Sequence, residues 1–395
     1  MSLIGTTVRG RRRRTMAIAA AVAALAVTAS ACGPEEDGGD AKASEGSDSQ
    51  PSGDRKQELG LPDELPKDIS LADIQKWLNG GWKDWDKDKW LREAEDFINP
   101  IIEDFWDRDR MGDAEENDRE RDVDDSDIDQ GVTDPAPDAV KAAKVPTPYT
   151  EKAPPVGKIF METPKGSMVC SGAVIKDPKN PGKSNLVATA GHCVHGGKGK
   201  GWFRNVVFVP QFNNKGLSSE QLQNAPKKDV APNGVYWAER ARTTDFWINN
   251  GSTSGGNGAP QDFAVLKVRP EEKSNTRSLE EAVGGAVEAD FDTPGVKNIP
   301  SLTARGYPAA PPYSGETMYA CKDKPSRLSL DPQQPTMYRV GCTMTGGSSG
   351  GPWLSADGEK LLSVTSIGPL DHTWLAGPAL DKKAKAVFDA VSNQG

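Results

Sequence analysis

The 395-residue sequence has only three histidines and five cysteines, and none of its apolar runs is long. The apolar stretch at residues 16–27 covers about a dozen residues, whereas a permanent membrane-spanning helix needs about 20. The sequence also has no basic cluster interleaved with aromatic residues, which argues against nucleic-acid binding. His192 and His195 have no third ligand at a useful spacing, so we expect no metal site.

The charge is distributed unevenly, although it totals only −9. Residues 33–150 carry about −19, whereas residues 1–32 and 151–395 each carry about +5. An acidic arm therefore precedes a mildly basic domain. Within the arm, residues 33–60 are rich in Gly, Ser, Asp and Glu and have too few apolar residues to bury a core, so we expect a disordered tether.

The first 32 residues have the pattern of an export signal: arginines at positions 9 and 11–14, the apolar stretch, and small residues before Cys32. This order resembles a bacterial lipoprotein signal, in which the cysteine is lipidated and becomes the mature N-terminus. The resemblance implies a lipid anchor on Cys32 at the extracellular face of the bacterial cell membrane. The alternative is simple secretion after cleavage near Ala31, which would leave Cys32 unmodified.

The rest of the arm has a helical part and a charged part. Residues 61–110 contain two amphipathic patterns, one beginning near Ser70 and one over residues 91–105, where Pro100 should kink or restart the helix and Asn99 could cap it. These helices could dock on the basic domain as a propeptide, or pack on each other as a spacer. Residues 111–150 are expected to form an acidic, disordered linker.

Residues 151–395 form the predicted folded domain, in which short apolar runs alternate with Gly, Pro and Asn. Such a pattern predicts many strands in an all-β sandwich or barrel. The clearest runs are residues 158–162, 168–175, 185–190, 206–212, 263–268 and 361–367. An amphipathic helix is predicted over residues 379–391, at the end of the chain.

Three motifs in this domain point to one chemistry. His192 lies in TAGHC at residues 189–193, Asp262 opens the apolar run DFAVLKV at residues 262–268, and Ser349 lies in GGSSGGP at residues 346–352. Over residues 155–395 the chain resembles the trypsin/chymotrypsin-like serine peptidases, and more narrowly their V8-like bacterial branch. The order His, Asp, Ser is the one that this fold uses. The resemblance implies a double β-barrel with a C-terminal helix. Asp245 is a rival for Asp262, but it does not open an apolar run.

The resemblance assigns a role to each of these residues. His192 would take the proton of the Ser349 hydroxyl, which is a poor nucleophile at neutral pH, and Asp262 would orient the imidazole. The backbone N–H groups of Gly347 and Ser349 would form the oxyanion hole. We therefore expect an exported, monomeric serine endopeptidase that acts on peptides or proteins without a cofactor. A non-catalytic binding lipoprotein with this fold and an esterase with the same triad are the alternatives.

Four cysteines remain if Cys32 carries lipid, and they allow three pairings. The pairs Cys170–Cys193 and Cys321–Cys342 close the shortest loops, and the resemblance favours the same two.

The resemblance also implies that residues both before and after Ser349 in the sequence form a substrate pocket. Thr343 stands where trypsin-like proteases have an Asp, and Met344 and Thr365 stand where glutamate-specific relatives have Thr and His. We therefore expect a medium, mainly apolar pocket, with residues Ser366 to Gly368 pairing with the substrate backbone.

The residue before the nucleophile is Ser348, where mammalian-type zymogens have an Asp that pairs with a newly cut N-terminus. Activation through such an ion pair is therefore not expected, and any control by the arm would have to be steric.

Overall fold

The computed structural model describes residues 97, 99, 101–116, 128, 132–153, 155–252 and 256–393. The chain separates into residues 1–50 and residues 51–395, and all described residues belong to the second unit. The predicted export signal with Cys32, the tether and the helix near Ser70 lie outside the described residues.

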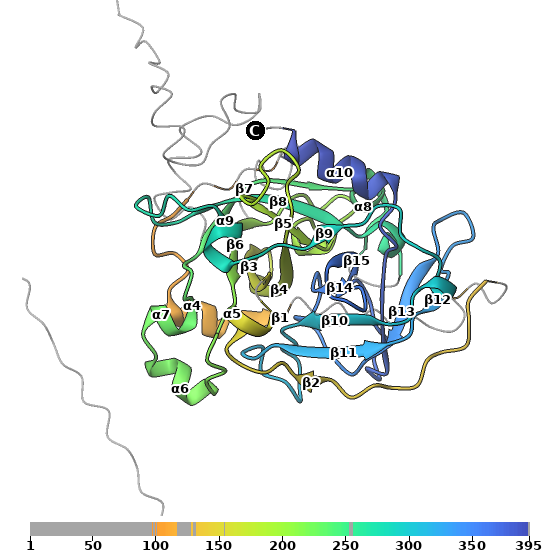
Figure 1. Ribbon diagram of the computed structural model, residues 1–395, viewed down its shortest axis with the longest axis horizontal. Helices are drawn as coiled ribbons and strands as arrows, with labels where there is room; N and C mark the ends of the chain where they lie inside the picture. Colours follow the sequence, from red (N-terminus) through yellow and green to blue (C-terminus); the bar gives the residue numbers. More distant parts are fainter. Residues whose placement is uncertain are drawn as a thin grey trace, which may run out of the picture. The chain divides into compact units, whose positions relative to one another are not determined.

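The first half of the fold is a closed six-stranded barrel (Figure 1). Its strands follow the order β4-β3-β6-β7-β8-β5, and β5 pairs back with β4 to close the circle. The strands are β3 (Val156–Thr163), β4 (Gly166–Ile175), β5 (Leu186–Thr189), β6 (Arg204–Pro210), β7 (Tyr236–Thr243) and β8 (Ala264–Pro270).

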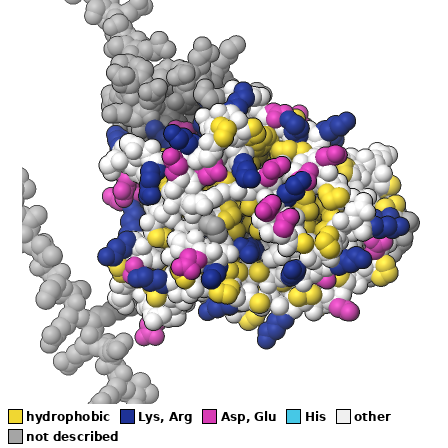
Figure 2. Space-filling view, viewed as in Figure 1, with side chains coloured by type: hydrophobic (Ala, Val, Ile, Leu, Met, Phe, Trp, Pro, Cys, Tyr) yellow, Lys and Arg dark blue, Asp and Glu magenta, His cyan; other side chains and the backbone are white. Residues whose placement is uncertain are grey.

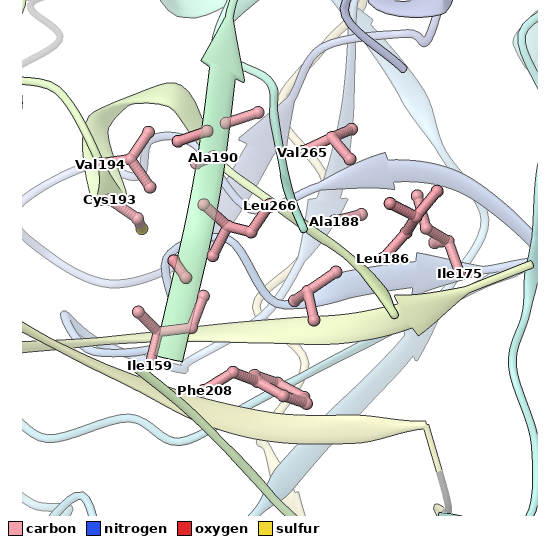
Figure 3. Packing of buried hydrophobic residues seen from close by; sticks show 14 of the residues in the cluster. Ile159, Ile175, Leu186, Ala188, Ala190, Cys193, Val194, Phe208, Val265 and Leu266 are labelled. Carbon is pink, nitrogen blue, oxygen red and sulfur yellow. The ribbon is translucent and has the colours of Figure 1, made fainter. Parts of the chain in front are cut away.

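Alternate residues of these strands enter two different cores, because successive side chains of a strand point to opposite faces. Ile159 and Phe208 point into the barrel, where they meet Leu186, Val265 and their neighbours (Figure 3). Phe160 and Val207 point outward into a second apolar cluster. Other segments of the chain must therefore cover the apolar side chains on the outer face of the barrel.

Residues 97, 99 and 101–116 supply part of that cover. Phe105 and Trp106 pack in the outer cluster, and the Trp106 indole donates a 2.6 Å hydrogen bond to the carbonyl of Asn205. The Asn99 amide donates to the carbonyls of Val206 and Ala238, and its oxygen accepts from Val206 N.

These contacts bear on the described part of the helix that was expected over residues 91–105. Residues 97, 99 and 101–105 are not helical, and among the described residues of this segment a helix, α4 (Arg108–Asp113), begins only after them. Asn99 bridges β6 and β7 instead of capping a helix, and burial of Phe105 and Trp106 overrides the helical spacing. The short strand β1 (Glu115–Glu116) then pairs with β4 in parallel.

The second half consists of two sheets that share one core. The six-stranded sheet has the order β2-β11-β10-β14-β15-β9, and the three-stranded sheet has the order β12-β13-β16. Their strands are β2 (Ala143–Lys144), β9 (Glu288–Ala289), β10 (Leu302–Gly306), β11 (Tyr319–Asp323), β12 (Ser326–Leu328), β13 (Met337–Gly341), β14 (Pro352–Leu354), β15 (Lys360–Val364) and β16 (Trp374–Gly377). Leu302 and Trp353 from one sheet meet Val340 and Leu375 from the other.

Residues 132–150 were expected to be a disordered linker, but the structure packs them on this second half. Strand β2 adds to the edge of β11, and Asp134 forms an ion pair with Arg327 at 2.7 Å. Tyr149 is fully buried, and its hydroxyl accepts a hydrogen bond from Met318 N. The packed chain therefore begins well before residue 151, because these residues complete the sheet edge and the core.

Helices occupy the periphery of this β structure. The helix α10 (Lys382–Ser392) packs on β7 and β8, and Asp381 caps it by accepting hydrogen bonds from two backbone N–H groups (Figure 1). The smaller helices are α5 (Tyr149–Lys152), α6 (Ser219–Asn224), α7 (Lys227–Val230), α8 (Asp245–Asn250) and α9 (Leu279–Val283). The predicted all-β double barrel with a C-terminal helix is confirmed.

Basic and acidic side chains are interspersed on the face shown in Figure 2, with hydrophobic side chains between them. Among the described residues, no helix has the length and apolar character that a membrane crossing requires.

Candidate active site

His192 lies directly after β5, in a short 3-10 turn over Gly191–Cys193. The turn packs so closely that a Cβ on Gly191 would lie 2.4 Å from Thr243 Oγ1 and 3.0 Å from Asp262 Oδ1. Cys193 forms a disulfide with Cys170 on β4. Closing a loop of this length stabilises a fold by about 3 kcal/mol in the chain-entropy account. The turn that carries His192 is therefore fixed on both sides.

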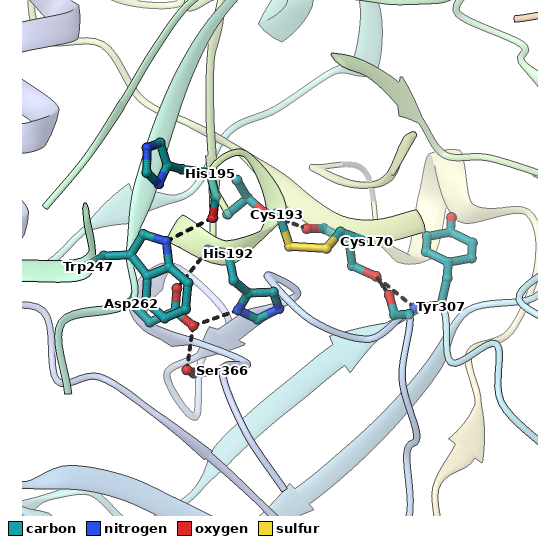
Figure 4. Close-up of a disulfide and its surroundings, with 11 residues drawn as sticks. Cys170, His192, Cys193, His195, Trp247, Asp262, Tyr307 and Ser366 are labelled. Carbon is teal, nitrogen blue, oxygen red and sulfur yellow. Dashed lines mark hydrogen bonds and ion pairs between the residues drawn. A yellow bond between two sulfur atoms is a disulfide. The ribbon is translucent and has the colours of Figure 1, made fainter. Parts of the chain in front are cut away.

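Asp262 lies just before β8, and both of its carboxylate oxygens take part in hydrogen bonds (Figure 4). Its Oδ1 accepts from the backbone N–H of His192 at 2.8 Å, and its Oδ2 lies 2.6 Å from His192 Nδ1. The Ser366 hydroxyl donates to the same Oδ2 at 2.6 Å. Asp262 is 0% exposed and His192 is 1% exposed. A carboxylate held in this way fixes the ring and keeps the proton of the neutral imidazole on Nδ1, so Nε2 can act as the base.

Ser349 lies in a loop whose backbone is hydrogen-bonded to Ser171 of β4. Ser171 N donates to the carbonyl of Ser349 at 2.7 Å, and the Ser171 hydroxyl donates to the carbonyl of Gly347 at 2.9 Å. Gly347 has φ +87° and Gly350 has φ +75°, and a Cβ on Gly350 would lie 2.0 Å from Thr189 Oγ1. Glycine is thus required for this tight turn.

His192 and Ser349 line the same cavity, which Met344, Thr365, Ser366 and Gly368 also line. The loop therefore brings the serine and the histidine together, although they are far apart in sequence. Within the described residues, the N–H groups of Gly347 and Ser349 donate no hydrogen bond to the protein. A substrate oxygen could therefore accept hydrogen bonds from both N–H groups.

Thr343 differs from the expectation, because it does not line this cavity. Its hydroxyl accepts from Ala142 N at 2.9 Å and lies 3.1 Å from the Tyr313 hydroxyl, and its N–H donates to the carbonyl of Val140. These contacts tie Thr343 to the segment that precedes β2. Thr343 therefore lies behind the cavity wall and braces it.

The predicted pocket residues did not include His372 and Leu375, which also line the cavity. His372 has φ +52° in a turn in which its N–H donates to the carbonyl of Pro369. No motif surrounds it, so only the fold could bring it to the cavity. Ser366 was expected only to pair with substrate backbone, but its hydroxyl also contacts Asp262.

The other candidates have structural contacts. His195 accepts a hydrogen bond from Gly197 N at its Nδ1 and packs edge-on against Trp202. Asp245, the rival carboxylate, is exposed as the first residue of α8. Cys170, His192 and Cys193 are close enough to suggest metal ligands, but the two sulfurs are bonded to each other. The second disulfide, Cys321–Cys342, joins β11 to the residue after β13.

Comparisons with known proteins give one family model and several solved structures to which the chain is similar. The family model described as a trypsin-like peptidase domain matches residues 170–361. No curated protein matches the chain. The structure of the thermostable serine protease AL20 from an extremophilic microorganism is 28% identical, with a TM-score of 0.50, and the match covers 62% of this chain and 99% of that one. The protease Anisep from Arthrobacter nicotinovorans is 25% identical, with a TM-score of 0.48, over 64% of this chain and 99% of that one.

The fold is thus the double β-barrel of the chymotrypsin-like proteases. The match to the trypsin-like peptidase model and the likeness to AL20 show that the protein is a serine endopeptidase.

Proposed function

We propose that His192, Asp262 and Ser349 form the catalytic triad of this endopeptidase. The proposal rests above all on the buried contact between Asp262 and the His192 ring, at 2.6 Å, beside the cavity that Ser349 also lines. A buried carboxylate is costly unless hydrogen bonds compensate it. Asp262 has such bonds, and the His192 ring is one of its partners.

In the acylation step, Ser349 Oγ attacks the carbonyl carbon of the scissile bond while His192 Nε2 takes the hydroxyl proton. The negative charge on the carbonyl oxygen is stabilised by the N–H groups of Gly347 and Ser349. The C–N bond then breaks, the leaving amine takes the proton from His192, and the acyl group remains as an ester on Ser349. A water molecule repeats the sequence and releases the acid, so the reaction consumes water alone.

We propose that the substrate residue on the acyl side of the scissile bond (P1) is preferentially a medium-sized apolar residue. The cavity beside Ser349 has a volume of about 50 Å³, and Met344 and Leu375 contribute apolar walls. The backbone from Ser366 to Gly368 lies along the same cavity and would pair with the substrate as an added strand. Cleavage of a peptide library should therefore favour apolar P1 residues. A profile dominated by charged P1 residues would contradict this assignment.

We also propose that the protein is exported and anchored by lipid on Cys32, in the V8-like branch of these peptidases. The two disulfides support export, because disulfides persist in oxidising compartments. Residues 1–32 supply the signal, and a lipidated Cys32 leaves an even number of cysteines for pairing.

Treatment with a fluorophosphonate followed by mass spectrometry tests both proposals. We expect one adduct, on the peptide that contains Ser349, and a mature N-terminus at Cys32 with the mass of attached lipid. Folded protein without an adduct would favour the non-catalytic binding module, and an adduct on Ser348 would contradict the assignment of the nucleophile. An unmodified Cys32 would favour simple secretion.

A further inference from the structure

A lysine is buried on the outer face of the first barrel. Lys158 of β3 is 3% exposed, and its Nζ lies 4.9 Å from the ring centres of both Phe160 and Phe212. Its ammonium donates a 2.9 Å hydrogen bond to the carbonyl of Gly315. Burying a cation without an ion-pair partner costs stability. Burial accordingly lowers the pKa of Lys158 to about 7, and the nearby charge of Glu316 only partly opposes this shift.

The carbonyl that Lys158 contacts belongs to a loop over residues 308–315. Gly315 N donates to the carbonyl of Pro308 at 2.8 Å, which closes the loop on itself. Gly315 has φ +75°, and a Cβ there would lie 3.0 Å from Ala309 Cβ and 3.3 Å from Lys158 Nζ. The ammonium, Gly315 and Ala309 therefore pack directly on one another.

The same loop holds the chain before Ser349. Ala309 N donates to the carbonyl of Gly346 at 2.6 Å, and the Thr345 hydroxyl donates to the carbonyl of Ala310 at 2.9 Å. A Cβ on Gly347 would lie 2.6 Å from the carbonyl oxygen of Tyr307 and 2.9 Å from Ala309 Cβ. The position of the loop thus determines where the Gly347 N–H can point.

We propose that Lys158 is a positioning residue for the oxyanion hole, because it fixes the loop over residues 308–315 against Gly346 and Gly347. This inference rests on the proposed role of Gly347 as an oxyanion donor. Lys158 does not touch the substrate. It acts through one hydrogen bond to Gly315 and through the packing of Ala309. An apolar residue at this position would be less costly to bury.

The surroundings of Lys158 define the pH dependence of its contribution to stability. Glu316 is the charged group that acts on it, and its carboxylate accepts hydrogen bonds from the hydroxyls of Ser219 and Ser314. The two aromatic rings carry no charge, and burial raises the pKa of Tyr307 in the same cluster well above its ordinary value, so it stays neutral.

The pKa of Lys158 is about 7 in the folded protein against 10.5 for an ordinary lysine, so the unfolded chain binds more protons between these values. The contribution of Lys158 to stability therefore increases with pH in this window, and its full cost is present below pH 7.

The test compares Lys158→Met with Lys165→Met, which removes an exposed lysine from the turn between β3 and β4. With p-nitrophenyl acetate as the substrate, Lys158→Met should lower kcat about tenfold and leave KM nearly unchanged, because a displaced oxyanion donor weakens only transition-state binding. Lys165→Met should leave both constants unchanged. At pH 6, Lys158→Met should unfold at a temperature no lower than the wild type. Between pH 7 and pH 10 the wild type should gain stability relative to this variant.

Different results contradict different parts of the account. A Lys158→Met variant that keeps the wild-type kcat would overturn the positioning role. A variant that melts at a lower temperature than the wild type at pH 6 would contradict the stability cost assigned to the buried ammonium. If the wild-type protein neither hydrolyses p-nitrophenyl acetate nor reacts with a fluorophosphonate, the proposed triad itself has failed.

Discussion

Ser349→Ala is expected to lower kcat by about 10⁶-fold, to the background of a fluorescein-casein assay. The variant loses the atom that forms the acyl-enzyme, while His192 and Asp262 keep their contact because neither depends on the serine hydroxyl. Substrate binding should change little, since the cavity walls and the backbone from Ser366 to Gly368 remain. A small residual rate over water can persist through binding and the oxyanion hole.

Ser348→Ala is the matched control for this experiment. Ser348 is the adjacent residue of the same loop, but its hydroxyl is buried and donates to the carbonyl of Thr345 at 2.7 Å. Loss of one such hydrogen bond should leave kcat within about tenfold of the wild-type value. If Ser348→Ala abolishes activity while Ser349→Ala keeps it, the nucleophile has been assigned to the wrong serine.

The strands that the sequence predicted best are those with unbroken apolar runs. The run at residues 168–175 became β4, and the run at residues 206–212 overlaps β6, whose residues are all buried. The weaker strands were missed for a physical reason. In β10 (Leu302–Gly306), Leu302 and Ala304 alternate with partly exposed residues, and in β7 charged residues interrupt the run at a register shift. Such strands depend on their partners more than on their own composition.

In the candidate site, too, the sequence predicts residues that lie in a local motif and misses those that depend on contacts between distant segments. The sequence identified His192 and Ser349 because each lies in a specific local motif. Lys158 and His372 have no such motif. The carbonyl that Lys158 contacts lies 157 residues later in the chain, so its role exists only in the folded protein. Thr343 was misplaced for a similar reason, because Ala142, on the segment taken for a linker, occupies its hydroxyl.

Asp262→Asn is expected to lower kcat by about 10⁴-fold with little change in KM or in the fold. The asparagine oxygen can still accept the hydrogen bond from the His192 backbone, so the turn should keep its shape. Its amide group, however, would donate to the ring nitrogen that now contacts Oδ2. That contact favours the tautomer with its proton on Nε2, and such a ring cannot take the proton of Ser349.

Asp245→Asn provides the control, because Asp245 is the rival that the sequence offers to Asp262. Asp245 is exposed at the start of α8, so its replacement should leave kcat unchanged. Both variants should be compared by kcat, by KM and by near-UV circular dichroism, which shows whether the core around Trp247 is intact. A fully active Asp262→Asn protein would disprove the triad. A loss of activity in Asp245→Asn alone would transfer the carboxylate role to the exposed residue, against the 2.6 Å contact that His192 makes with Asp262.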